Sequence, residues 1–336
     1  MTERTGRINV GVVGVGNCVS SLVQGVRFYA DAPDDAPGLT RPVCAGYAVR
    51  DIVFTAAFDV DAGKIGKDLS QALWAEPNNA SRFADVPHLG VPVDDGVLAD
   101  GVGAGTAPHI AASGRASVDD VARRLSETGT RVLVNFLPTG SQSATEAYAE
   151  AALRAGCAFV NCMPARLARE PRWARAFADA RLPLVGDDLK SQFGSTLVHH
   201  ALLDALAANG VRVRDTYQLN NGGNMDFLNL RDPERMRGKK ETKARGMGAG
   251  AGAPRVHVGA EYVPFLADRK VAYIRVEAQA FGGTPVEIDL RMCVEDSPSA
   301  AGNVLDAVRY AQAALDDGYG GVLAEASAAL MKAPTD

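Results

Sequence analysis

Lysine is scarce in this chain, and its distribution suggests where proton transfer or anion binding could take place. The sequence holds 35 basic residues, of which eight are lysine and the rest arginine. A chain that relies on arginine for surface charge is expected to keep lysine for positions that need a titratable amine or a compact point charge. An ordinary surface lysine is the alternative at each position. Six of the eight lysines follow residue 189: Lys190, Lys239, Lys240, Lys243, Lys270 and Lys332.

A second group of residues suits the binding of a dinucleotide. Residues 8–16 alternate small and β-branched apolar side chains and end in glycines, and residues 17–29 follow with apolar side chains at helical spacing. Strand, glycine turn and helix in this order let the backbone approach a pyrophosphate at a helix N-terminus, where free N–H groups favour negative charge. Val19 stands where the usual pattern has a third glycine. The predicted cofactor contacts of this turn are Gly14, Gly16, Asn17, Cys18 and Val19.

The next apolar segment predicts the position of an adenosine ribose. Residues 54–60 read as a strand and include Asp59, which is placed to accept hydrogen bonds from the ribose hydroxyls. An insertion over about residues 30–52 separates this strand from the preceding helix. Asp61 is predicted to cap a helix over residues 61–73. No arginine follows Asp59 closely to bind a 2′-phosphate, so the sequence favours NAD over NADP as cofactor.

Helices and strands alternate as far as residue 190 and predict the fold class. Residues 75–115 are rich in glycine and proline and are expected to form an elaborated loop. The rhythm beyond them predicts a Rossmann-like α/β fold with a doubly wound parallel sheet, whose ligands lie beyond the carboxyl ends of the strands. Those ends carry Pro138, Thr139 and Gly140 after one strand, and Asp187 and Asp188 after another. The segments are helices over 117–129, 141–156 and 171–180, and strands over 131–138, 157–165 and 182–188.

The pattern of apolar and polar residues changes in the second half of the chain and predicts a second α/β domain. A long helix is expected over 190–210, with His199 and His200 in structural positions, and a strand over 211–220. Two segments with strict alternation, 270–281 and 285–296, predict neighbouring antiparallel strands. Residues 246–254 predict a mobile loop, and residues 301–318 a final helix. We therefore expect a nucleotide-binding domain (1–190), a catalytic and oligomerisation domain (191–295) and C-terminal helices that return to the first domain (296–336).

Bulk composition excludes several classes of function. The net charge of −5 and the pI near 5.6 argue against nucleic acid and membrane surfaces as partners. No apolar run reaches the ~18 residues of a membrane helix, and the first residues have no apolar signal core, so a cytoplasmic location is expected. The five cysteines include no CxxC spacing and predict reduced thiols. The spacing of the His, Cys and carboxylate residues does not predict a metal site.

Six segments of the chain together form a recognisable pattern. In chain order they are residues 14–25, 186–200, 218–230, 268–282, 294–309 and 330–334. They resemble the inositol-phosphate synthases, in particular their shorter bacterial form. The resemblance covers nearly the whole chain and is far more specific than the glycine turn alone. It implies a tightly held NAD that is used and regenerated, the conversion of glucose 6-phosphate to an inositol phosphate, and a homotetramer.

The resemblance also implies roles for individual residues. The implied reaction oxidises C5 of the sugar, removes a proton from C6, lets C6 attack the C1 aldehyde and returns the hydride. Lys270 and Lys332 would assist hydride and proton movement at C5, since clustered amines lower one another's pKa. Lys190 and Lys243 would hold the phosphate and polarise the attacked carbonyl. Implied beside them in the pocket are Asp188, Asn224 and Asp226. Asp188 and Ser191 (at a helix start) would face the nicotinamide, and Asp187 and Asp296 are implied as cofactor contacts. Helix capping is the alternative for Asp187 and Asp188, and a helix-start signal is the alternative for Asp296.

The sequence departs from the family in its lid segment. The family usually has Ser-Lys-Thr followed by Gln or Asn, whereas residues 242–245 here read Thr-Lys-Ala-Arg. These residues are expected near the phosphate or the carbonyl end of the sugar, so the change leaves the substrate open. Fructose 6-phosphate is the alternative, with the same chemistry closing a five-membered ring. A plain NAD-dependent dehydrogenase and a non-catalytic NAD sensor are further alternatives, against which the four retained lysines argue.

Overall fold

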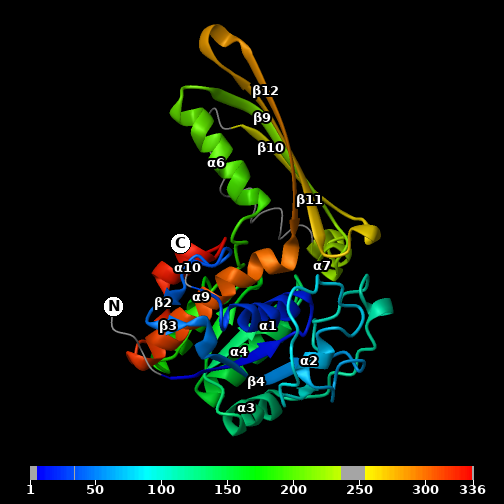
Figure 1. Ribbon diagram of the computed structural model, residues 1–336, viewed down its shortest axis with the longest axis vertical. Helices are drawn as coiled ribbons and strands as arrows, with labels where there is room; N and C mark the ends of the chain where they lie inside the picture. Colours follow the sequence, from blue (N-terminus) through cyan, green and yellow to red (C-terminus); the bar gives the residue numbers. More distant parts are fainter. Residues whose placement is uncertain (1–5, 34, 236–253, 335–336) are drawn as a thin grey trace.

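The computed structural model describes residues 6–33, 35–235 and 254–334, and its larger sheet has the predicted parallel architecture (Figure 1). Within these residues, seven strands follow the order β13-β8-β7-β6-β1-β4-β5, and every neighbouring pair is parallel. Because the order reverses at β1, the carboxyl ends of β1 and its neighbours open a crevice for ligands. The strands are β1 Ile8–Val13, β4 Ile52–Asp59, β5 Val93–Asp95, β6 Val132–Asn135, β7 Ala158–Asn161, β8 Pro183–Val185 and β13 Gly321–Val322.

Helices cover both faces of this sheet and form two apolar cores. On one face, Val19 and Leu22 pack with Val304 and Val308 of the last long helix. On the other face, Leu125, Tyr148 and Phe177 pack against the sheet. The predicted doubly wound fold is therefore confirmed. The helices of this domain are α1 Asn17–Tyr29, α2 Leu69–Ala72, α3 Val118–Glu127, α4 Gln142–Ala155, α5 Pro171–Asp179, α9 Asp296–Asp316 and α10 Ala324–Leu330.

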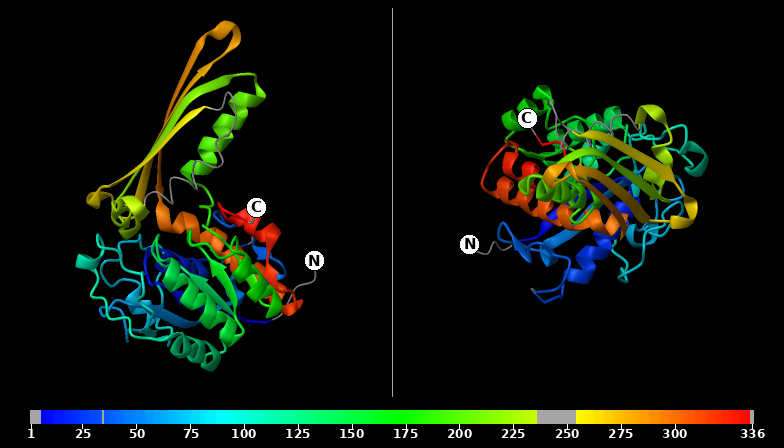
Figure 2. Two further views of the ribbon diagram at one scale, coloured as in Figure 1. Left: turned by 180° about the vertical axis from the view of Figure 1, so that it is seen from behind. Right: turned by 90° about the horizontal axis from the view of Figure 1, so that it is seen from above.

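A smaller sheet stands away from the first domain as an arm (Figures 1 and 2). Its order is β10-β9-β11-β12, with β10 parallel to β9 and the other pairs antiparallel. The predicted pairing of β11 with β12 is confirmed. Helix α6 packs on one face through Val198 and Leu202 against Ile274 and Val276. The elements are α6 Ser195–Ala208, β9 Arg212–Gly222, α7 Met225–Asn229, β10 Arg255–Tyr262, β11 Arg269–Gln279 and β12 Pro285–Glu295.

The return of the chain to the larger sheet brings distant segments together. Helix α9 follows β12 directly and packs against α1. The fully buried Arg309 of α9 donates to the carbonyl oxygens of Arg41, Pro42 and Tyr47 in the insertion that follows α1. The insertion and α9 thus stabilise each other. A short hairpin of β2 (Val43–Cys44) and β3 (Tyr47–Ala48) lies in the same insertion.

Several local predictions were wrong. The helix predicted over 61–73 is confined to α2, because Asp61 accepts the Gly63 N–H in a turn while Asp68 caps the helix through the Ser70 N–H. The helix predicted from residue 190 begins at Ser195, after an extended stretch. Strands β5, β10 and β13 and helix α7 were not predicted. Among the described residues, no helix is both long and apolar enough to cross a membrane.

Candidate active site

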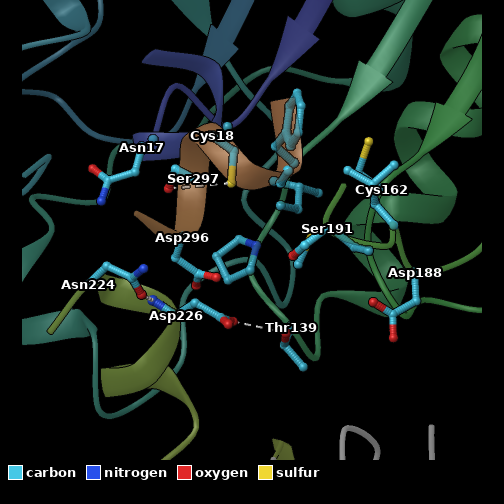
Figure 3. Close-up of a pocket in the computed structure, with 18 of the residues that line it drawn as sticks. Asn17, Cys18, Thr139, Cys162, Asp188, Ser191, Asn224, Asp226, Asp296 and Ser297 are labelled. Atoms are coloured by element: carbon cyan, nitrogen blue, oxygen red, sulfur yellow. Dashed lines mark hydrogen bonds between the residues drawn. The ribbon is translucent and has the colours of Figure 1, made fainter. Parts of the chain in front are cut away.

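A cavity of ≈ 730 Å³ lies between the carboxyl ends of the large sheet and the base of the arm (Figure 3). Most of the predicted site residues line it. Val19, Gly140 and Asp187 are not among the lining residues, and Lys243 lies outside the described residues. The predicted residues that do line it are Gly14, Gly16, Asn17, Cys18, Asp59, Pro138, Thr139, Asp188, Lys190, Ser191, Asn224, Asp226, Lys270, Asp296 and Lys332.

The glycine turn between β1 and α1 forms one wall of the cavity. Gly14 has a φ of +81°, and a Cβ atom there would lie 3.0 Å from the carbonyl oxygen of Phe136. Gly16 precedes the first turn of α1 and has open space where a side chain would project. Val19 is fully buried in the core beneath this turn, so its side chain supports the helix and does not face a ligand.

A buried lysine that the sequence interpretation missed stabilises the same turn. Lys64 is 5% exposed, and its Nζ donates to the Val15 carbonyl at 2.8 Å and to Asn78 Oδ1 at 3.0 Å. Asp59 accepts the Val15 N–H at 2.7 Å through Oδ2, which lies 3.8 Å from Lys64 Nζ. The backbone of Val15 is therefore held both at its N–H group and at its carbonyl oxygen. Lysine scarcity was the signal that could have identified Lys64, but the predicted helix over 61–73 obscured it.

Two lysine–carboxylate pairs also line the cavity. Lys270, near the start of β11, is hydrogen-bonded to Asp296, the first residue of α9. Lys332 Nζ donates to Asp188 Oδ1 at 2.9 Å. Asp188 is 5% exposed and has a left-handed φ of 63°, and its Oδ2 has no hydrogen-bond partner among the described residues. The two pairs therefore offer two ammonium groups and an acceptor oxygen to a ligand.

A third amine lies close to the second pair. Lys190 Nζ donates to the Ala328 carbonyl at 2.8 Å, near the C-terminal end of α10. Burial and, after it, the positive charge of Lys332 lower the pKa of Lys190. A lower pKa brings the Lys190 amine closer to the range in which a lysine can exchange protons, as the predicted chemistry requires.

A carboxylate missed in the sequence joins three segments around the cavity. Asp268 is 1% exposed, and its Oδ1 accepts from Asn17 Nδ2 at 2.9 Å, Asn224 Nδ2 at 3.0 Å and Ser297 Oγ at 2.8 Å. Burial raises the pKa of Asp268 to about 6, opposed by the hydrogen bond from Asn224 and reinforced by the charge of Asp296. Asp268 thus connects the glycine turn, the loop before α7 and the start of α9.

Asn224 and Thr139 organise the floor of the cavity. Asn224 Oδ1 caps α7 by accepting the N–H groups of Asp226 and Phe227. Thr139 Oγ1 donates to Asp226 Oδ1 at 3.1 Å (Figure 3).

Burial raises the pKa of Cys18 to about 12, so this thiol stays protonated and is a poor nucleophile.

Two further residues named in the sequence analysis, Asp187 and His199, lie outside the cavity. Asp187 is fully buried and accepts from Asn161 Nδ2 at 2.8 Å and from the backbone of the loop after β7, including Leu167 N–H at 3.1 Å. Its carboxylate therefore stabilises that loop, and the capping role considered as its alternative is not observed either. His199 is buried, with Nε2 2.7 Å from Thr216 Oγ1, which agrees with the expected structural role, whereas His200 lines the cavity.

Ser191 and Asp296 differ in how they fit the sequence interpretation. Ser191 lines the cavity from the extended stretch before α6, not from a helix start. Asp296 is the first residue of α9, as the helix-start alternative requires, and it also lines the cavity. Its contact with the cofactor stays a prediction. Among the described residues, no group of three or more His, Cys, Asp and Glu side chains is arranged to hold a metal ion.

Comparison with known proteins identifies the family. The myo-inositol-1-phosphate synthase family model matches residues 194–297. The chain is 46% identical to the inositol-3-phosphate synthase of Mycolicibacterium smegmatis, over 99% of this chain and 95% of that protein. The chain belongs to the inositol-phosphate synthase family. It is 45% identical to the Corynebacterium glutamicum inositol-3-phosphate synthase, over 99% of this chain and 94% of that protein. These relatives identify an isomerase-type enzyme.

Solved structures agree with this family assignment. The crystal structure of Ari2 is similar with a TM-score of 0.85 and 39% identity, covering 98% of this chain and 93% of that one. A myo-inositol-1-phosphate synthase-related protein from Thermotoga maritima gives a TM-score of 0.74 and 27% identity with the same coverage. The Caenorhabditis elegans inositol-3-phosphate synthase, at 17% identity and a TM-score of 0.75, covers 99% of this chain and 81% of that one and shares the fold.

The inositol-phosphate synthases are NAD-dependent, and the residues here fit such a cofactor. Space at Gly16 is open where a side chain would block a pyrophosphate, and the free N–H groups at the start of α1 face that space. Asp59 lines the cavity at the end of β4, although two hydrogen bonds to its Oδ1 come from the Val60 and Asp61 N–H groups. Its carboxylate therefore shapes the turn, and its contact with a ribose stays a prediction.

Proposed function

We propose that this enzyme converts glucose 6-phosphate to a myo-inositol phosphate by NAD-dependent cyclisation without net redox change. The observation that carries the proposal is the convergence of Lys190, Lys270 and Lys332 on the cavity that the dinucleotide-type glycine turn also lines. A plain dehydrogenase needs one proton-transfer group, whereas ring closure needs cations at both an enolate and a forming alkoxide. Three amines in one cavity suit the second requirement.

The cofactor would be held by the glycine turn and by the polar groups beside it. Gly14, Gly16 and the start of α1 would bind the pyrophosphate, and Asp59 the adenosine ribose. Asp188 Oδ2 and Ser191 are suited to the nicotinamide end, since Asp188 Oδ2 is a buried acceptor without a partner among the described residues. When bound, NAD supplies a hydride acceptor that is restored within the same turnover.

The lysines have separate roles in this proposal. Lys270, held by Asp296, and Lys332, held by Asp188, would move the proton of the C5 hydroxyl and stabilise charge that develops at C5 and C6. Lys190 would polarise the attacked C1 carbonyl, which is the oxygen that becomes an alkoxide on ring closure. Lys243, outside the described residues, is proposed to bind the phosphate. Asn224 and Asp226 would orient the sugar hydroxyls.

Fructose 6-phosphate is the second candidate substrate, favoured by the altered lid segment. Thr242, Ala244 and Arg245 replace the residues usual in the family around Lys243. A ketose would keep oxidation at C5 and deprotonation at C6, and C6 would then attack C2 to close a five-membered ring. The same lysines serve both routes, so the substrate decides the ring size.

Assembly into a homotetramer is also part of the proposal. Leu219 and Tyr273 pair across β9 and β11 and are 37% and 42% exposed. Their neighbour Ile274 is buried beneath α6, and successive strand residues point to opposite faces, so the two exposed side chains lie on the face away from α6. An apolar pair on an open sheet face suits a contact between copies of the chain. Light scattering of the purified protein measures the number of subunits.

One experiment tests substrate and reaction together. The purified protein is incubated with NAD and either glucose 6-phosphate or fructose 6-phosphate, each labelled with carbon-13 at C6, and carbon spectra are recorded. We expect a new C6–C1 bond from the aldose without accumulation of NADH. A C6–C2 bond from the ketose alone would establish the five-membered ring instead. Accumulation of NADH without a new carbon–carbon bond would refute cyclisation.

A further inference from the structure

Arg235, which lies shortly after α7, crosses from the arm to two loops of the nucleotide-binding domain. Its Nη1 donates to the carbonyl oxygen of Thr139 at 2.6 Å, and its Nη2 donates to the carbonyl oxygen of Asp100 at 3.1 Å. The two acceptors lie in different loops, one after β6 and one in the long insertion before α3. A guanidinium can reach both because its donors form a rigid planar fork, whereas a lysine ammonium on a flexible stem has a single nitrogen.

The surrounding backbone leaves room for this side chain. A Cβ atom at Gly103 would lie 2.9 Å from Arg235 Cζ, and a Cβ atom at Gly140 would lie 2.9 Å from Arg235 Cγ. A side chain at either position would therefore displace the arginine from where it lies, and the φ of +92° at Gly140 favours glycine in addition. Gly140, predicted from the sequence as a cofactor contact, is explained by this packing.

The contact of Arg235 reaches the cavity through one residue. The Thr139 carbonyl also accepts Asn229 Nδ2 at 2.8 Å, so two donors hold the same oxygen. Thr139 itself lines the cavity, and its hydroxyl donates to Asp226 Oδ1. Because a peptide group held by two donors cannot rotate freely, the Thr139 side chain is kept within hydrogen-bonding distance of Asp226.

We infer that Arg235 is a positioning residue for the reaction: it fixes the loop after β6 so that Thr139 orients Asp226 toward the substrate. Arg235 is not itself among the residues that line the cavity. Its effect on the reaction is therefore indirect and falls on the alignment of the sugar more than on the binding of the cofactor, whose pyrophosphate site is the glycine turn. A displacement of about 1 Å in such an aligned group can cost up to ~10²-fold in rate.

The kinetic part of this inference rests on the proposed function, and its test uses a conservative variant. Arg235→Lys keeps the charge but reaches only one of the two carbonyls. We expect kcat to fall about 10-fold or more, with KM and NAD affinity within about threefold of the wild type and an unchanged melting temperature. Arg231→Lys is the matched control, since Arg231 is exposed and lies on the same segment. Equal kcat values for the two variants would overturn the inference.

A double-variant comparison separates positioning by Arg235 from a general loss of stability. If Arg235 acts through Thr139, Thr139→Val and Arg235→Lys must be non-additive in kcat, the double variant being no slower than about the worse single variant. Additive effects would overturn the pathway through Thr139.

Hydrogen–deuterium exchange of residues 136–144 tests the structural claim without substrate. We expect faster exchange in Arg235→Lys than in the wild type and in Arg231→Lys. Unchanged exchange would refute the positioning role. If the wild type closes neither sugar into a ring, the proposed function fails, while the exchange result still decides whether Arg235 holds the loop.

Discussion

The two ends of the cavity are built in different ways. At the nucleotide end, Asp59, Lys64 and Asn78 bind the peptide of Val15, and all four residues come from the first 78 of the chain. At the catalytic end, Lys270 meets Asp296 across 26 positions and Lys332 meets Asp188 across 144. The proposed cofactor contacts therefore depend on the N-terminal part of the chain alone. The proposed catalytic pairs depend on later segments and on the return of the C-terminal segment to the larger sheet.

This difference predicts which property each substitution should change. Substitutions at the catalytic end should lower the rate while leaving cofactor binding nearly intact. Substitutions in the glycine turn should weaken cofactor binding. Asp268, which contacts both ends through Asn17, Asn224 and Ser297, should instead make stability depend on pH.

The largest effect is expected from Lys270→Met. It removes the ammonium that is held by Asp296 and leaves that carboxylate without its partner on β11. We expect kcat to fall about 10³-fold, within the range for loss of a general acid–base group, with NAD affinity changed less than about threefold. Steady-state kinetics and calorimetric titration with NAD measure the two quantities. Lys67→Met, at an exposed lysine, is the control, and a similar kcat for both variants would contradict the assigned role.

A somewhat smaller loss is expected from Lys332→Met. The rate should fall about 10²-fold, since Lys190 remains in the cavity as a neighbouring amine. Removal of the Lys332 charge should also raise the pKa of Lys190, because that charge is one of the two causes of its depression. Reductive methylation with labelled formaldehyde, followed by NMR titration of the methyl signals, measures the pKa of Lys190. An unchanged pKa would show that the two amines do not interact.

Asp268 is expected to make folding stability fall as the pH rises. Its pKa is raised from 3.8 to about 6 in the folded chain, so the native state binds this proton more tightly than the unfolded state does. That contribution to stability is complete below pH 3.8 and is lost as the pH rises through 6, a change of about 3 kcal/mol. Urea unfolding of the wild type and Asp268→Asn between pH 4 and 7 measures it. A constant difference between the two proteins would refute the raised pKa.

The smallest effect is expected in the glycine turn. Gly14→Ala places a Cβ atom 3.0 Å from the Phe136 carbonyl oxygen at a φ of +81°. We expect about tenfold weaker NAD binding, equivalent to ~1.4 kcal/mol, with kcat at saturating NAD close to that of the wild type. Gly66→Ala is the matched control because Gly66 has the same φ and no neighbour within 4 Å of a Cβ atom. Equal NAD affinity in both variants would mean that backbone strain alone, and not the contact with Phe136, matters.

The periodic parts of the chain were predictable because their patterns are local. Alternating helices and strands gave the doubly wound sheet, and strict alternation gave the pairing of β11 with β12. Short elements escaped prediction because two or three residues contain no period: β13 is two residues long and β5 three. The apolar spacing of Ile65, Leu69 and Leu73 imitated a helix that the left-handed Gly66 interrupts.

The sequence predicted which residues line the candidate site better than it predicted which of these residues pair with one another. Resemblance to the family supplied Lys270, Lys332 and Asp296 as candidate site residues. Which carboxylate each lysine meets depends on how α9 and α10 return to the large sheet. Asp268 escaped because its contacts lie 251 positions away at Asn17 and 44 positions away at Asn224. Contacts at such separations leave no local pattern in a sequence.

The position of α9 has a consequence for the order in which this chain folds during its synthesis. Most of the large sheet leaves the ribosome before the arm, yet Val304, Val308 and Leu330, which complete its core, come from the last 40 residues. At 5–20 residues per second, translation from β8 to the end of α9 takes roughly 10 s. During that interval the face of the nascent sheet that carries α1 lacks the cover of α9 and α10. We expect the nucleotide-binding domain to begin folding first and finish last, which makes this face a natural target for a chaperone.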